Sequence, residues 1–463
     1  MIYLDVTRIL SRFMRSAPTG IDRVEFAYLE EIWKRSGDYA PSFVLTTPWF
    51  SGLVRAERVL DIIARLERAW GLHVMAAEDG VYGEVKSWIE RPLDQAARRT
   101  RRFGGKTTFQ MFRDEMIYPF RDIARAATRL TRQLERQSAH AKAYLNVSHL
   151  QLDTPERLDW TKRYNLDSAF LLHDTIPIDY PEFCAEGADT QHQLRLKTVG
   201  EMGSLVIVNS HFTANSVRRH FENQQLPAPN LKVVPLGVDA KFNPGAIHDA
   251  PKTTTPYFIC VGTIEPRKNL QFLLAIWRRL IDRNGAATPR LLIVGRRGWE
   301  NENIVDLLER SSAIAPYIAE VSDLTDAGLA ALMAGACAVL APSIVEGFGL
   351  PSVEALACGT PVIASDIEAH REVTGPLAVY VDAIDGNGWI SAIEAYAAKA
   401  SEPRAKAQSA LKGLQPHTWP QHVTMVMDEL LATLAASPRQ GAASKRKAGA
   451  KANAKSHNAA IAR

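Results

Sequence analysis

Short apolar runs recur along the chain, separated by segments whose apolar residues have helical spacing. Strands that alternate with helices in this way are typical of parallel, doubly wound sheets covered by helices on both faces. A length of 463 residues exceeds what one hydrophobic core usually holds, so two domains are expected. The predicted strands are 2–6, 143–147, 169–173, 204–209 and 231–237 in the first half, and 257–262, 290–295, 317–321, 337–342, 361–365 and 377–382 in the second.

A polar, proline-containing stretch at 239–256 interrupts this pattern and has the composition of a linker. We therefore predict an α/β protein with two Rossmann-like, doubly wound domains that face each other across a cleft. In open α/β sheets ligands bind at the carboxyl ends of the strands, so the cleft is the expected site. The predicted parts are a first domain at 1–240, a linker at 241–256, a second domain at 257–415, a helix at 416–436 that packs back on the first domain, and a tail at 437–463.

The composition argues against several other classes of protein. No apolar run reaches the roughly 18 residues that a membrane span needs, and Asp5 interrupts the first apolar run, unlike the core of a signal peptide. The four cysteines have no C-x-x-C spacing, which indicates neither a disulfide framework nor a zinc site. The expected location is the cytoplasm.

Basic residues are concentrated in two segments, although the formal net charge is only +4. Residues 437–463 carry seven Lys or Arg and no acid, and we expect this tail to be disordered. Residues 91–136 hold twelve Lys or Arg against five acids, with helical spacing of apolar residues from Phe120 to Leu134. Such a helix could lie on the anionic inner face of a membrane, or pack on the domain with its arginines solvated. Nucleic acid is not an expected partner, because no recognition motif accompanies the basic segments.

The stretch VEGFGLPSVEALACGTPVIASD, at 345–366, predicts a turn and a helix between two buried strands. Pro351 suits the first turn of that helix and Gly359 the left-handed position after its end, so the helix should cover about 351–358. Amides at the start of a helix have no partner within it, and they favour an anion such as a diphosphate. The amides in this position belong to Gly347, Phe348, Gly349 and Leu350.

Two glutamates frame this turn. Glu354, in the predicted first helical turn, could accept hydrogen bonds from a vicinal diol such as a ribose, and Glu346 could reach a second polyhydroxylated group. The alternative is that Glu354 only complements the helix dipole and that Glu346 is solvated.

Two cations follow the predicted strand 257–262. Arg267 and Lys268 stand near the start of the next helix, where they could clamp a diphosphate and stabilise it as a leaving group. The alternative is a solvated helix start. Because the same domain supplies acceptors at Glu346 and Glu354, a nucleotide sugar is a ligand that would use both sets of groups.

These motifs resemble the retaining glycosyltransferases of family 4, which have the GT-B fold. The resemblance covers nearly all of 1–435 and is strongest in VGTIEPRKNL, LLIVGRRGW, VSDLTDAGLAALMAGACAVLAPSIVEGFGLPSVEALACGTPVIASD and EVTGPLAVYVD. It implies a donor-binding second domain and an acceptor-side first domain. It also implies that Glu346 contacts the donor sugar, Glu354 the ribose, and Arg267 with Lys268 the diphosphate.

In the first half the resemblance is carried by LLHDTIPIDYPEF and APTGIDRVE. The first implies that His173 and Asp174 lie in the active site, although a histidine at a strand end is more often a packed residue. The second is similar to a glycine loop beside the diphosphate, with Thr19 in place of a first glycine, and Gly20 allows close approach of the backbone. Arg23 is a weaker candidate, for which a surface salt bridge is the alternative.

The resemblance implies transfer of a hexosyl unit from a nucleoside diphosphate sugar to an acceptor hydroxyl, with retention at the anomeric carbon. Neither a metal nor a cofactor is expected, because Arg267, Lys268 and the helix amides would neutralise the diphosphate. VGTIEPRKNL followed by GFGLP is most similar to bacterial mannosyl or rhamnosyl enzymes, which favours GDP-mannose as the donor. Such enzymes build surface polysaccharide, lipopolysaccharide included, on glycan or lipid-linked oligosaccharide acceptors.

Two other functions remain open at this point. A sugar-nucleotide epimerase shares the two-domain architecture but needs no acceptor, so free epimerised product would identify it. A non-catalytic nucleotide-sugar-binding protein would bind the donor without turnover across a broad set of acceptors.

Overall fold

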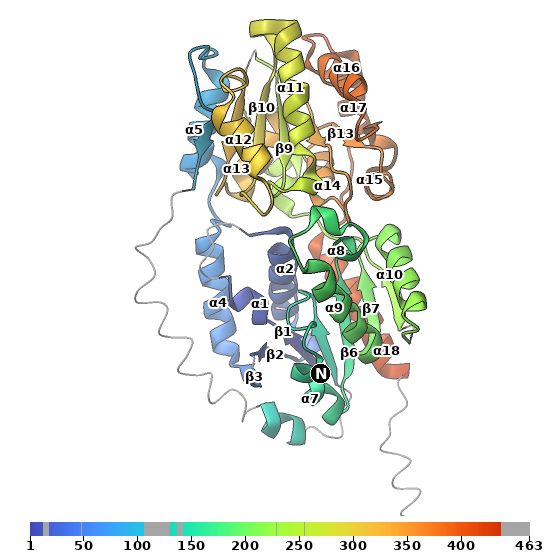
Figure 1. The fold of residues 1–463 in the computed structure, drawn as a ribbon. Coiled ribbons are helices and arrows are strands. Elements are labelled where there is room, and N and C mark those ends of the chain that lie inside the picture. The colour runs from blue at the N-terminus through green and yellow to red at the C-terminus, as the bar shows by residue number, and fades with distance from the viewer. Residues whose placement is uncertain are drawn as a thin grey trace, which may run out of the picture.

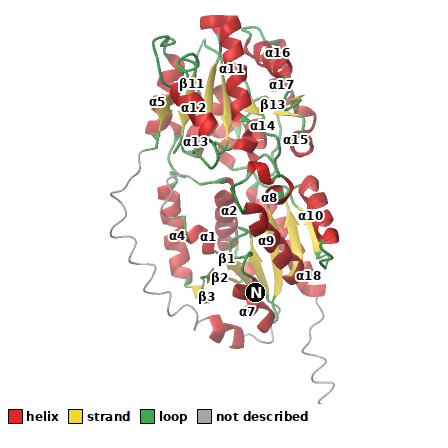
Figure 2. Cartoon of the chain, in the orientation of Figure 1, coloured by secondary structure: helices red, strands yellow, loops and turns green. Residues whose placement is uncertain are grey.

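Two α/β domains stacked one above the other make up the chain (Figure 1). The computed structural model describes residues 1–12, 18–47, 49–105, 130–136, 142–227, 229–253 and 255–436. Each domain contains a seven-stranded sheet with helices on its faces, as the cartoon in Figure 2 shows. The predicted α/β class with two Rossmann-like domains is confirmed.

The N-terminal sheet has the strand order β3-β2-β1-β5-β6-β7-β8. All neighbouring strands pair in parallel except β2 and β3, which form an antiparallel hairpin at the edge. The strands are β1 Ile2–Asp5, β2 Pro41–Thr46, β3 Ser51–Val54, β5 Ala143–Asn146, β6 Asp167–Leu172, β7 Gly203–Val208 and β8 Asn230–Val233. The longer helices are α2 Gly20–Lys34, α4 Ala56–Ala69, α9 Ala188–Met202 and α10 His211–Asn223, and α7 Asp159–Arg163 is a short one.

The C-terminal sheet has the strand order β14-β13-β12-β9-β10-β11-β4, and its pairs are parallel. Its strands are β9 Tyr257–Val261, β10 Arg290–Val294, β11 Ile318–Val321, β12 Val339–Ala341, β13 Val362–Ser365, β14 Ala378–Val381 and β4 Arg101–Phe103. Its helices are α11 Leu270–Asn284, α12 Glu302–Arg310, α13 Asp326–Gly335, α14 Leu350–Ala357, α15 Glu368–Thr374, α16 Gly386–Ala397 and α17 Glu402–Ala410.

An arm from the N-terminal half, residues 76–103, packs on the C-terminal domain. Its helix α5, Gly80–Glu90, contacts α13, and its strand β4 pairs with β11. The buried guanidinium of Arg290 lies 4.7 Å from the centre of the Trp88 ring and donates to backbone carbonyls of the arm. The boundary expected from the sequence placed this arm in the first domain. Strand β4 has only three residues in a basic stretch, too few to show a strand pattern.

The chain returns to the N-terminal domain at its end. Helix α18, Trp419–Ala436, packs against α2, where the Tyr28 hydroxyl lies 2.9 Å from Nε2 of His422. Apolar side chains of α18 join the N-terminal core, as the sequence led us to expect. Of the two basic segments, the tail and most of the predicted helix lie outside the described residues. None of the described helices is both long and apolar enough to cross a membrane.

The packing of α18 generates a stability prediction. Leu430 is fully buried in the N-terminal core, whereas its neighbour Leu431 is 42% exposed. Leu430→Ala should lower the free energy of unfolding by about 2–5 kcal/mol, and Leu431→Ala by no more than about 0.5 kcal/mol. Urea denaturation followed by fluorescence measures both variants. Equal losses would contradict the packing of α18 on this domain.

Candidate functional site

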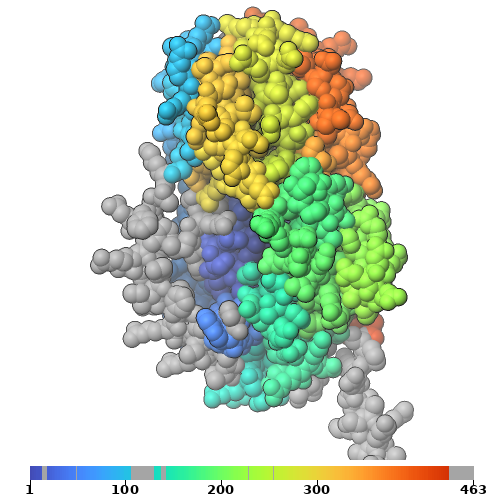
Figure 3. All heavy atoms as spheres, viewed as in Figure 1, coloured from blue at the N-terminus to red at the C-terminus, as the bar shows by residue number. Residues whose placement is uncertain are grey.

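The candidate site lies where the carboxyl ends of the two sheets face each other, and the space-filling view shows the two domains in contact there (Figure 3). His173 and Asp174 directly follow β6, and Gly347 lies in the loop after β12. A Cβ atom on Gly347 would lie 2.6 Å from the carbonyl oxygen of His173 and 2.8 Å from Cβ of Asp174. The hydroxyl of Ser210 donates to the carbonyl of Gly347 at 2.7 Å. Only glycine permits this approach, which brings three predicted residues together across the domain boundary.

Glu346 is the centre of a buried charge cluster. Nη1 of Arg267 lies 2.7 Å from Oε2 of Glu346, and both Nζ of Lys268 and the Ser343 hydroxyl contact Oε1. Although burial opposes it, the two cations hold the pKa of Glu346 well below its usual range. Arg267 also pairs with Glu265 at 2.6 Å. The sequence led us to expect that these cations hold a diphosphate, and in the structure both contact Glu346.

The turn before α14 has the geometry that the sequence predicts. Gly349 has a φ of +86° and precedes the first helical residue, Leu350. The amides from Gly347 to Leu350 therefore lie at the helix start, outside its own hydrogen bonds. The Phe348 side chain is buried in the N-terminal core, so this residue can offer a ligand only its backbone. Helix α14 begins one residue earlier than predicted, and Glu354 is its fifth residue rather than part of its first turn.

Glu354 lies in a second charge cluster, which contains a cation from the opposite domain. Arg23 of α2 places Nη2 2.6 Å from Oδ1 of Asp326 and Nη1 3.8 Å from Oε1 of Glu354. Burial raises the pKa of Glu354 to about 8, with Asp326 and Asp239 adding to the shift and Arg23 opposing it. Arg23 is therefore an interdomain contact rather than the surface salt bridge considered as an alternative.

His173 is buried against the ring of His149, which in turn contacts the ring of His192. Its Nε2 lies 2.9 Å from the carbonyl oxygen of Val147, which assigns the ring proton to Nε2 and leaves Nδ1 as an acceptor. Burial lowers the pKa of His173 to about 4, so the ring is neutral near pH 7. The arrangement supplies a fixed acceptor rather than a proton donor.

Gly20 lies at the start of a helix of the N-terminal domain, and His370 lies beside the Gly349 turn. Gly20 is the exposed first residue of α2, whose start is capped by Thr19 and Asp22, and a Cβ there would meet no atom within 4 Å. His370 of α15 was missed by the sequence reasoning. Its ring lies against Gly349, and its charged form would face Glu346. The only signal for it is a position shortly after a predicted strand, which is too weak to single it out.

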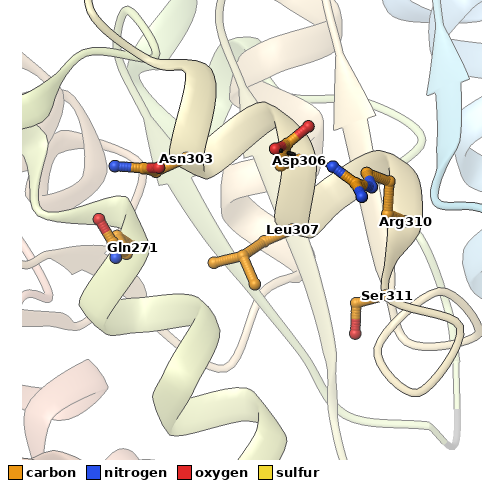
Figure 4. A pocket seen from close by; sticks show the side chains of 6 residues that line it. All are labelled: Gln271, Asn303, Asp306, Leu307, Arg310 and Ser311. Atoms are coloured by element: carbon orange, nitrogen blue, oxygen red, sulfur yellow. Dashed lines mark hydrogen bonds and ion pairs between the residues drawn. The ribbon is translucent and has the colours of Figure 1, made fainter.

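A surface hollow of about 430 Å³ lies between α11 and α12. Figure 4 shows the side chains that line it. None of the predicted site residues lines it. Among the described residues, no group of three or more His, Cys, Asp and Glu is arranged to hold a metal ion. The hollow is lined by Gln271, Asn303, Asp306, Leu307, Arg310 and Ser311.

The chain is similar to a family and to curated proteins that are named for glycosyl transfer. Residues 255–399 match the family described as "Glycosyl transferases group 1". Serotype-specific mannosyltransferase WbdA of Escherichia coli is 29% identical over 255 residues, which cover 50% of this chain and 30% of WbdA. MMP alpha-(1->4)-mannosyltransferase of Mycolicibacterium hassiacum is 36% identical over 151 residues, 32% of this chain and 34% of that protein. The matched part of the chain thus spans about a third of these relatives.

Solved structures share the fold over nearly the whole chain. Anabaena HepE in complex with UDP has a TM-score of 0.54 at 14% identity, covering 93% of this chain and 99% of that one. Sucrose-phosphate synthase from Thermosynechococcus elongatus has a TM-score of 0.53 at 16% identity, covering 94% and 99%. At these identities the likeness shows the fold alone.

The contact at Gly347 generates a prediction about the docking of the domains. A methyl group on Gly347 would clash with the backbone at His173, so Gly347→Ala should destabilise the protein by about 1–3 kcal/mol and open the interface. Small-angle X-ray scattering should give a larger radius of gyration for this variant. Gly83→Ala is the matched control, because a Cβ on Gly83 meets no atom within 4 Å. An unchanged radius for Gly347→Ala would show that the interface is looser than described.

Proposed function

Residues 255–399 form a glycosyl transferases group 1 domain within a two-domain GT-B fold, and from this premise we propose that the chain is a retaining glycosyltransferase. It moves a hexosyl unit, with mannose favoured, from a nucleoside diphosphate sugar to a hydroxyl of a glycan or lipid-linked acceptor. The observation that carries the proposal is the meeting of the Glu346–Gly347 turn with His173 and Asp174 across the interface.

The donor would lie along the carboxyl edge of the C-terminal sheet. The diphosphate would take hydrogen bonds from the amides at the start of α14 and from Arg267 and Lys268. These cations already lie at the turn, paired with Glu346, so a diphosphate would join or replace a carboxylate as their partner. Glu354 would accept from the ribose hydroxyls, and Glu346 would contact the donor sugar.

The proposed chemistry needs no carboxylate nucleophile. The bond from the anomeric carbon to the diphosphate oxygen breaks, and the acceptor oxygen bonds to that carbon on the same face. The acceptor proton passes to the leaving diphosphate, whose growing charge Arg267 and Lys268 stabilise. The neutral ring of His173 would orient the sugar from the acceptor side. The side chain of Asp174 would do so as well. Metal independence is part of this proposal.

The relatives support the choice of sugar. Several of the matching proteins are named mannosyltransferases, among them O-antigen chain mannosyltransferase B of Escherichia coli. GDP-mannose is therefore the donor to test first, with surface polysaccharide as the setting and the inner face of the membrane as the place of action. No specific observation favours an epimerase or a non-catalytic binding protein.

A donor screen with a transfer assay tests the proposed function. GDP-, UDP- and dTDP-sugars are compared by thermal shift, since a ligand that binds the folded form raises the melting temperature. Transfer is then followed with the stabilising donor and mannooligosaccharides. Arg267→Met should lower kcat by about 10²–10³, whereas Arg278→Met, on the exposed side of α11, should not. Free epimerised sugar nucleotide, or binding without transfer, would favour the alternative functions.

The environment of Glu354 generates a prediction about pH. A diol binds the ionised carboxylate better, and the pKa of Glu354 is about 8, so GDP affinity should rise by about tenfold between pH 7 and pH 9. Arg23→Met removes the charge that opposes this shift, and should move the rise to higher pH. Calorimetric titration with GDP measures both.

Glu354→Gln is the control for this pH dependence. It should bind GDP weakly at every pH, since no charge remains to be formed. A wild-type profile that is flat over this range, or unchanged in Glu354→Gln, would remove Glu354 from the ribose site.

A further inference from the structure

A second hollow, of about 530 Å³, opens on the N-terminal domain beside the β2–β3 turn. Its size falls within the range of about 300–1,000 Å³ that is typical of ligand pockets. The rings of Phe50, Trp160 and Tyr164 line it, and Trp49 stands at its edge. Nothing in the proposed donor site uses these residues.

Trp49 is exposed to solvent, and its backbone amide is hydrogen-bonded. The Thr47 hydroxyl accepts from the amides of Trp49 and Phe50 at 3.3 and 3.0 Å, and the Thr47 amide donates to the Phe50 carbonyl at 2.9 Å. Trp49 is nevertheless 86% exposed, the largest exposed fraction among the big apolar side chains described. Large aromatic side chains are normally mostly buried. An exposed indole that lines a hollow is suited to binding a partner through its face.

The other side of the hollow is polar and balanced in charge. Arg157 and Arg163 stand there with Glu156 and Asp159, and Thr154 adds a hydroxyl. Two cations against two carboxylates give no net attraction for a polyanion or an anionic lipid surface. A sugar ring is uncharged, with an apolar C–H face for an aromatic ring and hydroxyls that hydrogen-bond to carboxylates and guanidinium groups. This combination of groups matches a glycan.

The hollow belongs to the same edge of the N-terminal sheet as His173. The Ser51 hydroxyl contacts the Thr46 hydroxyl at the carboxyl end of β2 and donates to the carbonyl of Arg157, both at 3.3 Å. His173 follows β6, three strand intervals away in the order β2-β1-β5-β6. Neighbouring strands lie about 4.8 Å apart, so the hollow and His173 are separated by roughly 14 Å or more. The twist of the sheet moves the strand ends further apart.

We propose that this hollow is a glycan-binding subsite that holds sugars of the acceptor set back from its reacting end, with Trp49 as the stacking platform. The inference rests on the proposed function for the identity of the glycan. The hollow would contact a part of the acceptor that the cleft between the domains does not reach. A short acceptor bound at His173 does not reach the hollow, whereas a longer one does.

Binding without a donor tests the subsite directly. Wild-type protein is titrated with α-linked mannohexaose and followed by calorimetry and ligand-observed NMR. Trp49→Ala should weaken binding at least tenfold, and Trp49→Tyr, which keeps an aromatic face, should stay within threefold of wild type. Ile384→Ala removes a similarly exposed apolar side chain from the other domain, and should change nothing. Unchanged melting temperatures confirm that the variants are folded.

Transfer kinetics and binding to lipid vesicles distinguish a failure of the subsite from a failure of the proposed function. With mannohexaose as acceptor, Trp49→Ala should raise KM at least tenfold and leave kcat unchanged, and with mannobiose it should change neither. If no sugar nucleotide supports transfer but mannohexaose binding depends on Trp49, the proposed function fails and the subsite stands. If transfer occurs and mannohexaose binding does not depend on Trp49, the subsite is wrong. Trp49-dependent binding to phosphatidylglycerol vesicles, without mannohexaose binding, would also overturn it.

Discussion

The structure depends on how charge is buried at the carboxyl edge of the C-terminal sheet. A buried carboxylate is costly unless cations and hydrogen-bond donors surround it. Glu346 is buried with Arg267, Lys268 and Ser343 around it, and this pairing fixes the turn that leads into α14. The same cations give the edge a local charge that suits a diphosphate. The side chains that stabilise this turn are thus the ones that the proposed donor would contact.

The second cluster shows why the two domains must be considered together. Burial raises the pKa of Glu354, and Asp326 and Asp239 lie close enough to raise it further. The cation that opposes this shift, Arg23, comes from α2 of the other domain. Separation of the domains would leave these acids without Arg23. The charge on Glu354 is therefore coupled to domain contact, and the affinity for a diol would follow it if Glu354 has the proposed role.

Much of this could be predicted from the sequence, because strand and helix patterns are strong in the second half. The helix predicted at 351–358 is present as α14, one residue earlier at each end, and the Gly349 turn occurs where the glycine pattern placed it. The sequence could not predict which residues far apart in the chain contact each other in the folded protein. The pairing of Lys268 with Glu346, the link from Arg23 to Asp326 and the proximity of Gly347 to His173 join residues 78 to 303 positions apart. Strand β4 was not predicted, because three residues are too few to show the alternation of apolar and polar residues that marks a strand.

Contacts from several parts of the chain join the two domains. The chain passes between them four times: into the arm with α5 and β4, back to β5, forward to β9, and back again to α18. Across the interface, the carboxylate of Glu372 accepts from the amides of His211 and Phe212 at 2.6 and 3.0 Å, at the start of α10. Opening the interface would have to break this cap and the Gly347 contact. The carboxyl edges of the two sheets are thus held together by backbone contacts from both domains as well as by the ion pair of Arg23 with Asp326.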